Sequence, residues 1–316
     1  MDFRTVLNEN EISSTQNKID YQSKIGLMGS CFVENIGEKL NYYKFQNWVN
    51  PFGILFQPLA IEKALDSIVN KRLFSPSDLI EHDGLWHSLH HHSKFSNTDK
   101  GKVLSSINTA LVESHEALKT SSHFIITLGT AWVYHHIETN QLVANCHKIP
   151  QKEFVKRLLT IEEITSSLEH SKTLVRSLNP NIEIIITLSP VRHLKDGMIA
   201  SARSKALLLT AIHEVTGVDY CHYFPSYEIL QDDLRDYRFY NSDMLHPNES
   251  SVLYIWEYFV KKWMSPSNAK AMALVNKIQK GLKHKAFNPK SKKHLSFVEN
   301  LKKDKELLLK KYAIKL

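Results

Sequence analysis

A serine–cysteine pair near the start of the chain and an Asp-x-x-His segment near its end contain the residue types of a nucleophile and its base. Ser30 and Cys31 follow a glycine and directly precede a helical pattern. Backbone N–H groups and the helix dipole at such a place stabilise negative charge on an attacking atom. Asp243 and His246 are three residues apart, so one short turn can hold the carboxylate against the imidazole. The pattern predicts acyl transfer through a covalent acyl-enzyme, with His246 as the base.

Short apolar runs and helical patterns alternate along the chain, which is typical of a doubly wound α/β sheet. Strands are predicted over residues 24–28, 124–128, 182–188 and 217–223. Helices are predicted over residues 32–40, 59–69, 103–118, 161–178 and 198–215. Residues 70–101 lack clear periodicity and are interpreted as an insertion or long loop. Ligands bind such sheets beyond the carboxyl ends of the strands, where Ser30, Thr130 and His193 fall.

Composition limits the classes of protein that the chain can belong to. With 316 residues, 42% of them apolar and 23% charged, it falls in the range of soluble globular proteins. Three cysteines in a chain of this length do not form a disulfide framework. The first residues lack the basic and apolar regions of a signal peptide. We therefore expect a cytoplasmic protein with free thiols.

The positive charge of the chain is concentrated in its last 52 residues. Residues 265–316 contain 14 lysines and three acidic residues, a balance of +11, which leaves about −4 of the total +7 for residues 1–264. Their apolar residues recur at helical spacing, namely Ala273, Leu274, Ile278, Leu282, Leu301, Leu307, Leu308 and Leu309. A Lys-rich helical extension packed on a domain of residues 1–264 is one interpretation. Weak contact with an anionic surface is the other. No motif indicates a specific nucleic-acid partner.

Several separate segments together resemble the GSCFA domain family. They are GSCF at the first strand, then NPFG, TLGTAWVY, ANCHK, TLSPVRHLKDG, YFPSYEIL, DDLRDYRFY and DMLHP, between residues 25 and 259. The family is grouped with SGNH/GDSL-type hydrolases. The resemblance implies a flavodoxin-like three-layer α/β/α sandwich and an esterase or acyltransferase that acts on O-acyl esters. It implies no metal, nucleotide or other cofactor.

The SGNH motif blocks map onto this sequence with one ambiguity at the nucleophile. Asp243 and His246 match the last block directly. In the first block, strict register places Cys31 at the nucleophile position, whereas a slip of one residue places Ser30 there. The resemblance therefore leaves both residues as candidates for the nucleophile.

The blocks that supply oxyanion donors match less completely. Gly53 resembles the glycine of the second block, and Asn50 is a second candidate donor. Where the third block has an asparagine, this chain has Gly-Thr-Ala-Trp, so Thr130 or a backbone N–H would have to replace the amide. Loss of one such donor costs about 3–4 kcal/mol of transition-state stabilisation. The alternative is a non-catalytic protein that binds an acylated sugar or a protein partner in the same cleft.

Other residues near the predicted strand ends are candidates for substrate binding. Arg192 and His193 follow the third strand and could orient a small-molecule or acylated-sugar substrate. Trp132 and His147 are candidates for substrate binding in the pocket wall. Cys146 is adjacent to His147, and because adjacent side chains of a strand point to opposite faces, the two are not expected to form a catalytic pair. Four histidines lie close together in the sequence, but no nearby cysteine or carboxylate completes a metal-ligand set, so no metal site is predicted there. They are His87, His90, His91 and His92. The oligomeric state stays open.

Overall fold

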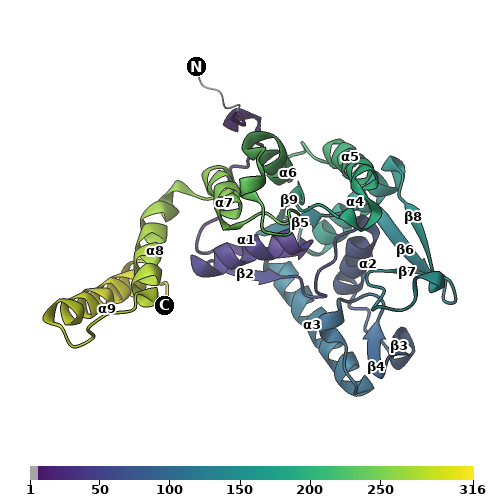
Figure 1. The fold of residues 1–316 in the computed structure, drawn as a ribbon, viewed down its shortest axis with the longest axis horizontal. Helices are drawn as coiled ribbons and strands as arrows, with labels where there is room; N and C mark the ends of the chain where they lie inside the picture. Colours follow the sequence, from purple (N-terminus) through teal and green to yellow (C-terminus); the bar gives the residue numbers. More distant parts are fainter. Residues whose placement is uncertain (1–5) are drawn as a thin grey trace.

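The computed structural model describes residues 6–316 and contains a central sheet of five parallel strands (Figure 1). The spatial order is β10–β9–β5–β1–β2. Their bounds are β1 (Lys24–Gly29), β2 (Gln46–Val49), β5 (His123–Leu128), β9 (Glu183–Leu188) and β10 (Cys221–Phe224). The order reverses at β1, so the carboxyl ends of β1 and β5 form the edge where doubly wound sheets bind ligands.

Helices cover both faces of the sheet. One face carries α1 (Cys31–Tyr42) and α7 (Glu249–Trp263), and the other carries α2 (Pro58–Val69), α3 (Lys100–Thr120), α4 (Ile161–Leu178) and α5 (Met198–Val215). Ile125 and Ile185 pack with α1 and α7, whereas Ile126 and Ile186 pack with the second set of helices. Because side chains alternate along a strand, strands rich in isoleucine can fill both layers. The predicted three-layer α/β fold is confirmed.

Edge strand β2 and two small sheets were not predicted from the sequence. β3 (Leu79–His82) and β4 (Leu85–Ser88) form a hairpin inside the segment interpreted as an insertion or long loop, so the long-loop alternative was wrong there. Its turn is Asp83-Gly84, with φ of 50° and 71°, the left-handed conformation that two-residue hairpins require. The other sheet has the order β7–β6–β8 and consists of β6 (Trp132–His136), β7 (Gln141–Val143) and β8 (Phe154–Leu158).

The chain after β10 is helical. The predicted fourth strand corresponds to β10 and begins at residue 221 instead of residue 217. After β10, α6 (Ser226–Glu228) continues into a π-helical turn over Ile229–Leu234. Helices α8 (Ala269–Lys283) and α9 (Lys292–Tyr312) form the helical C-terminal region. The division of the chain into a domain of residues 1–264 and an extension of residues 265–316 stays a prediction. Residues 1–5 of that domain lie outside the described part of the chain.

The apolar face predicted for the C-terminal helices is partly wrong. Ile278 and Leu308 are buried as expected. Leu282, Leu307 and Leu309 are about half exposed, and the other buried positions of α8 are Ala271, Met272 and Val275. Leu308 is the one buried residue of α9, and Leu307 and Leu309 on either side of it are exposed.

Within residues 6–316, no helix has the length and hydrophobicity that crossing a bilayer demands.

The turn after β1 gives a test of the fold. A Cβ atom at Gly29 would lie 2.2 Å from the carbonyl oxygen of Thr127, and the φ of Gly29 is +146°. We expect Gly29→Ala to lower the free energy of unfolding by about 2–3 kcal/mol in urea titration. Gly84→Ala is the matched control, because Gly84 also has a positive φ but an added Cβ meets nothing within 4 Å. An equal loss in both variants would contradict a role for the close contact.

Candidate functional site

The turn between β1 and α1 is held by hydrogen bonds from two neighbouring strands. The N–H of Gly29 donates to Asn50 Oδ1 at 2.8 Å, and the N–H of Ser30 donates to the carbonyl of Thr127 at 3.0 Å. Asn50 is buried, and its Nδ2 donates to Glu34 Oε1 at 3.3 Å. The side chain of Asn50 therefore positions the turn in this structure.

Ser30 and Cys31 have different environments. Ser30 is 1% exposed, and its hydroxyl accepts a hydrogen bond from the N–H of Phe32, so it caps α1. Cys31 is the first residue of α1 and is half-buried. Its Sγ lies 3.6 Å from Nε2 of His246. Of the two candidate nucleophiles, the structure brings Cys31 to the imidazole.

Asp243 orients the imidazole from the opposite side. Its Oδ1 accepts the N–H groups of Leu245 and His246 at 2.9 and 3.0 Å, and its Oδ2 lies 2.7 Å from Nδ1 of His246. These backbone and side-chain hydrogen bonds lower the pKa of Asp243 to about 2. Because an ionised carboxylate can only accept, Nδ1 carries a proton, and in the neutral imidazole Nε2 presents its lone pair to the thiol.

The surroundings of the Cys31 thiol favour its protonated form. Burial and the nearby Glu34 carboxylate raise its pKa above the ordinary value, although the N–H groups of Cys31 and Phe32 and the Lys205 ammonium act in the opposite direction. A thiol of this kind needs a base before it can attack. His246 is the group placed to take the proton.

Lys205 belongs to the site but was not found by sequence reasoning. It lies on the buried face of α5, is 4% exposed, and donates from Nζ to the carbonyl of Ser189 at 2.6 Å. Burial lowers the pKa of Lys205 to about 7. In the sequence, Lys205 falls on the same helical face as Ser201 and Leu208. A search for regularly spaced apolar residues does not detect a lysine at such a position.

Like Asn50 Nδ2, which donates to Glu34, the other two predicted oxyanion donors already have partners. The N–H of Gly53 donates to the carbonyl of Asn50 at 2.8 Å, in a turn where Gly53 has a φ of +80°. Thr130 Oγ1 lies 3.0 Å from Ser204 Oγ and accepts the N–H of Trp132 at 3.1 Å. An oxyanion role for either residue requires it to exchange these partners, and it stays a prediction.

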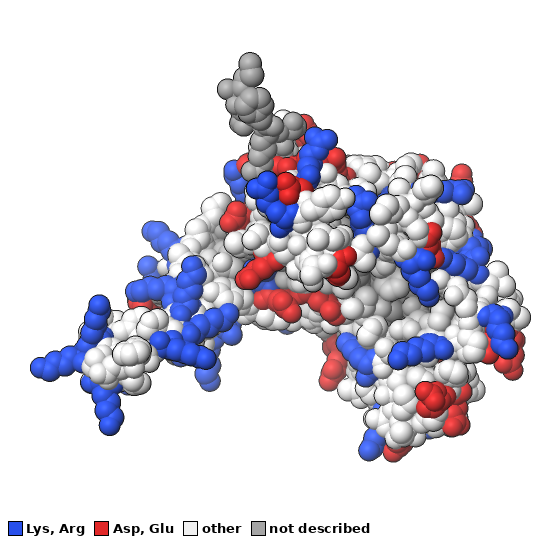
Figure 2. Space-filling view, viewed as in Figure 1, with Lys and Arg blue, Asp and Glu red and all other residues white. Residues whose placement is uncertain are grey.

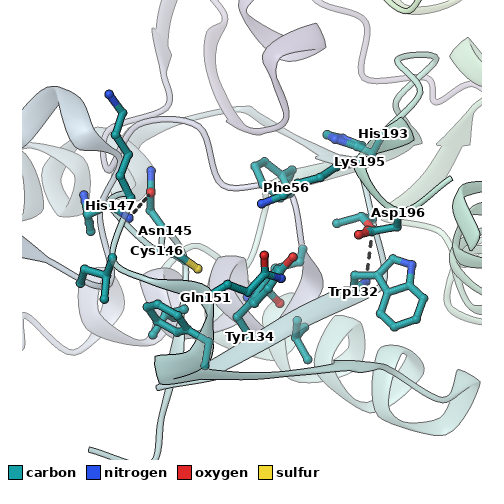
Figure 3. Close-up of a pocket in the computed structure, with 18 residues that line it drawn as sticks. Phe56, Trp132, Tyr134, Asn145, Cys146, His147, Gln151, His193, Lys195 and Asp196 are labelled. Atoms are coloured by element: carbon teal, nitrogen blue, oxygen red, sulfur yellow. Dashed lines mark hydrogen bonds between the residues drawn. The ribbon is translucent and has the colours of Figure 1, made fainter. Parts of the chain in front are cut away.

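A cavity of about 390 Å³ lies at the same edge of the sheet (Figure 3), and its lining includes His193 but neither Cys31 nor His246. The small sheet forms its outer wall, and loops that follow β2, β5 and β9 form the inner wall. Most of its lining surface is apolar, and polar side chains also contribute. The lining includes Phe56, Gln57, Thr130, Trp132, Tyr134, Asn145, Cys146, His147, Gln151, Phe154, His193, Lys195 and Asp196.

His193 connects this cavity with the imidazole. It lines the cavity, its ring lies 5.2 Å from that of Phe56, and its Nε2 finds no partner within residues 6–316. Burial and the neighbouring Lys205 and His246 lower the pKa of His193 to about 4, so it is neutral at pH 7. Gln57 also lines the cavity and is 3% exposed; in the same range, neither Oε1 nor Nε2 of its carboxamide has a partner. Sequence reasoning missed Gln57.

The remaining predicted binding residues are divided between this cavity and a second one. Trp132 stands in the wall of the first, with Lys156 Nζ 4.5 Å from its ring centre. Arg192 hydrogen bonds to Gln231 and lines a hollow of about 420 Å³ that also includes Asp243. Asp243 therefore lines the second hollow, whereas His193 lines the first.

The loop after β7 differs from the prediction. Cys146 and His147 lie in a turn rather than in a strand, with a φ of 48° at His147. Both residues line the cavity, and Figure 3 shows the sulfur of Cys146 directed into it. His147 Nε2 is held by the carbonyl of Ser88 at 2.8 Å.

Among residues 6–316, no three His, Cys, Asp or Glu side chains meet as a metal site would require.

Comparisons with known families identify the chain. Residues 24–259 match the GSCFA family, and residues 275–314 match the GSCFA domain protein, C-terminal domain. The chain belongs to the GSCFA family. No curated protein matches this GSCFA chain.

Solved structures with a similar backbone have distant sequences. A carbohydrate esterase family 3 protein from Talaromyces cellulolyticus is 9% identical, with a TM-score of 0.37, over 81% of this chain and 99% of the other. An acetyl xylan esterase from the rumen bacterium Butyrivibrio proteoclasticus is 12% identical, with a TM-score of 0.32, over 84% of this chain and 66% of the other.

The state of the Cys31 thiol can be tested by alkylation. Because its pKa is raised, we expect the rate of modification by iodoacetamide to increase about tenfold per pH unit through neutral pH. Peptide mapping by mass spectrometry, in a Cys146→Ser background, assigns the modification to Cys31. A rate that is already constant at pH 7 would instead indicate a thiolate–imidazolium pair.

Proposed function

We propose that this protein is a thiol-dependent acyl hydrolase or acyltransferase that acts on small O-acyl esters. The observation that supports this most directly is the line of three groups from Cys31 Sγ to His246 Nε2, 3.6 Å away, and from His246 Nδ1 to Asp243 Oδ2, 2.7 Å away. These are a nucleophile, a base and a group that orients the base, at the carboxyl edge of an α/β sheet. SGNH-type chemistry with cysteine in the place of serine describes the arrangement.

The reaction follows from the positions of these groups. His246 Nε2 takes the thiol proton as the sulfur of Cys31 attacks the ester carbonyl carbon. The tetrahedral intermediate collapses, the carbon–oxygen bond breaks, and the imidazolium returns the proton to the leaving alcohol. A thioester on Cys31 remains. Water or an acceptor alcohol, deprotonated by His246, then attacks the thioester carbonyl. The carbon–sulfur bond breaks, the carboxylic acid or new ester leaves, and the imidazolium reprotonates the Cys31 thiolate.

The oxyanion is assigned to donors at the start of α1. The N–H groups of Cys31 and Phe32 lower the pKa of the Cys31 thiol, and the helix dipole reinforces them; the N–H of Phe32 also donates to Ser30 Oγ at 3.3 Å. Among the predicted side-chain donors, Asn50 Nδ2 has the longest present bond, 3.3 Å to Glu34, and can most readily exchange it for a carbonyl oxygen. Gly53 and Thr130 are the further candidates.

The cavity favours an acylated sugar as the substrate. Carboxamides carry both donors and acceptors, as hydroxyl groups do, and Gln57, Asn145 and Gln151 line the cavity. Trp132 and Tyr134 offer flat apolar surfaces on which the C–H face of a sugar ring can pack. A volume of about 390 Å³ suits one ring rather than a polymer chain.

A reducing compartment suits this chemistry. All three cysteines are free, and a catalytic thiol is lost when it is oxidised. We therefore place the protein in the cytoplasm.

Substitutions at the nucleophile turn test the assignment. We expect Cys31→Ala and His246→Ala to lower kcat/KM for 4-nitrophenyl acetate at least about 1,000-fold, because the acyl-enzyme cannot form. Ser30→Ala should retain most activity and lose about 1 kcal/mol of stability through the missing helix cap. Intact-mass detection of an acetyl group on residue 31 is the direct readout. Loss of activity in Ser30→Ala with activity retained in Cys31→Ala would reverse the assignment.

Gln57 tests the sugar assignment separately from the chemistry. We expect Gln57→Leu to raise KM about tenfold for penta-O-acetyl-glucose and to leave 4-nitrophenyl acetate unaffected, because the smaller ester does not fill the cavity. Gln57→Glu, similar in size, is the control for shape. If the leucine variant instead gained activity on 4-nitrophenyl octanoate without loss on the sugar ester, the cavity would be an acyl-chain site.

A further inference from the structure

The end of the C-terminal helical hairpin is strongly basic. We call residues 282–298, from the last turn of α8 through the loop into α9, the hairpin tip. No acidic residue occurs between positions 265 and 298. Figure 2 shows basic side chains around this part of the molecule, which projects from the body. The exposed lysines of the tip are Lys283, Lys285, Lys290, Lys292 and Lys293.

The hairpin tip also exposes large apolar side chains. Phe287 is fully exposed, and the exposed fractions of Leu282, Leu295 and Val298 are 49%, 58% and 47%. Single exposed apolar residues are common on protein surfaces, but several within one short segment mark an interaction site. They are interspersed with the five lysines and lie far from the central sheet (Figure 1).

The hairpin behind the tip is an ordered scaffold. A Cβ atom at Gly281 would lie 2.6 Å from Leu301 Cδ1, so the two helices approach closely at this glycine. Lys277 pairs with Asp304 at 2.7 Å, and Tyr42 of α1 donates to Asn276 at 2.8 Å. These contacts fix α8 against the body and α9 against α8. The tip side chains are therefore presented outward rather than packed against the domain.

We propose that the hairpin tip docks the protein on the surface of an anionic lipid bilayer. Lysines attract acidic headgroups, and adjacent Phe and Leu side chains enter the region between the headgroups and the acyl chains. A nucleic acid backbone would use the lysines but would leave Phe287 and Leu295 exposed to water. The combination of both residue types in one tip favours the lipid surface.

Flotation of the full chain with vesicles tests this proposal. We expect binding to vesicles of phosphatidylcholine with phosphatidylserine, weakened by salt, and at least about tenfold weaker binding to phosphatidylcholine alone. Lys290→Gln/Lys292→Gln/Lys293→Gln and Phe287→Ser/Leu295→Ser should each weaken binding at least about tenfold. Leu73→Ser is the control, because Leu73 is 61% exposed on the body, away from the tip. Circular dichroism checks that every variant is folded.

Three results would overturn the proposal. The first is no binding of the wild type to either vesicle. The second is equal binding to both vesicles. The third is binding to duplex RNA that competes with the vesicles and depends on the lysines but not on Phe287 and Leu295, which would assign the tip to a nucleic acid. None of these measurements depends on ester hydrolysis, so they are independent of the activity of Cys31.

Discussion

The close contact between the turn after β1 and strand β5 fixes the position of the reactive thiol. Because Gly29 lacks a side chain, its Cα can pass directly beside the backbone of Thr127, and the next N–H bonds to the Thr127 carbonyl at 3.0 Å. Helix α1 therefore begins immediately at the end of the strand, with Cys31 in its first turn. Asn50 closes the turn from the side of β2. A longer connection would move the sulfur away from the sheet edge and from the helix N-terminus.

The second half of the site is positioned by the same helical layer. Asn248 caps α7 through a hydrogen bond from Ser251, and the Asp243–His246 turn directly precedes this cap. α7 packs beside α1 in one hydrophobic layer, in which Phe32 and Ile255 are both buried. The 3.6 Å between sulfur and imidazole thus depends on helix packing between segments more than 200 residues apart. Non-covalent packing between the two helices therefore sets the distance between the two parts of the site.

Sequence reasoning succeeded where the signal is local or periodic. Short apolar runs indicated β1, β5 and β9, and the three-residue spacing of Asp243 and His246 indicated their turn. It missed β2, whose side chains are only partly buried, and the antiparallel sheet β6–β8, whose short strands alternate weakly. The choice between Ser30 and Cys31 depends on which side chain faces a residue 215 positions away. No pattern within the chain contains that information.

Lys205 shows how the departure in the third motif block can be accommodated. Thr130 precedes Ala131, which stands where the amide is missing, and Thr130 contacts Ser204; this contact ties the loop after β5 to α5 one residue before Lys205. The Lys205 ammonium lowers the pKa of the Cys31 thiol, as a positive group near a developing anion must. Because the pKa of Lys205 is itself about 7, this support is full below neutral pH and is lost above it. The lysine side chain thus contributes electrostatic stabilisation near the sulfur, while deprotonation of the thiol is favoured at higher pH. The two trends oppose each other as the pH rises.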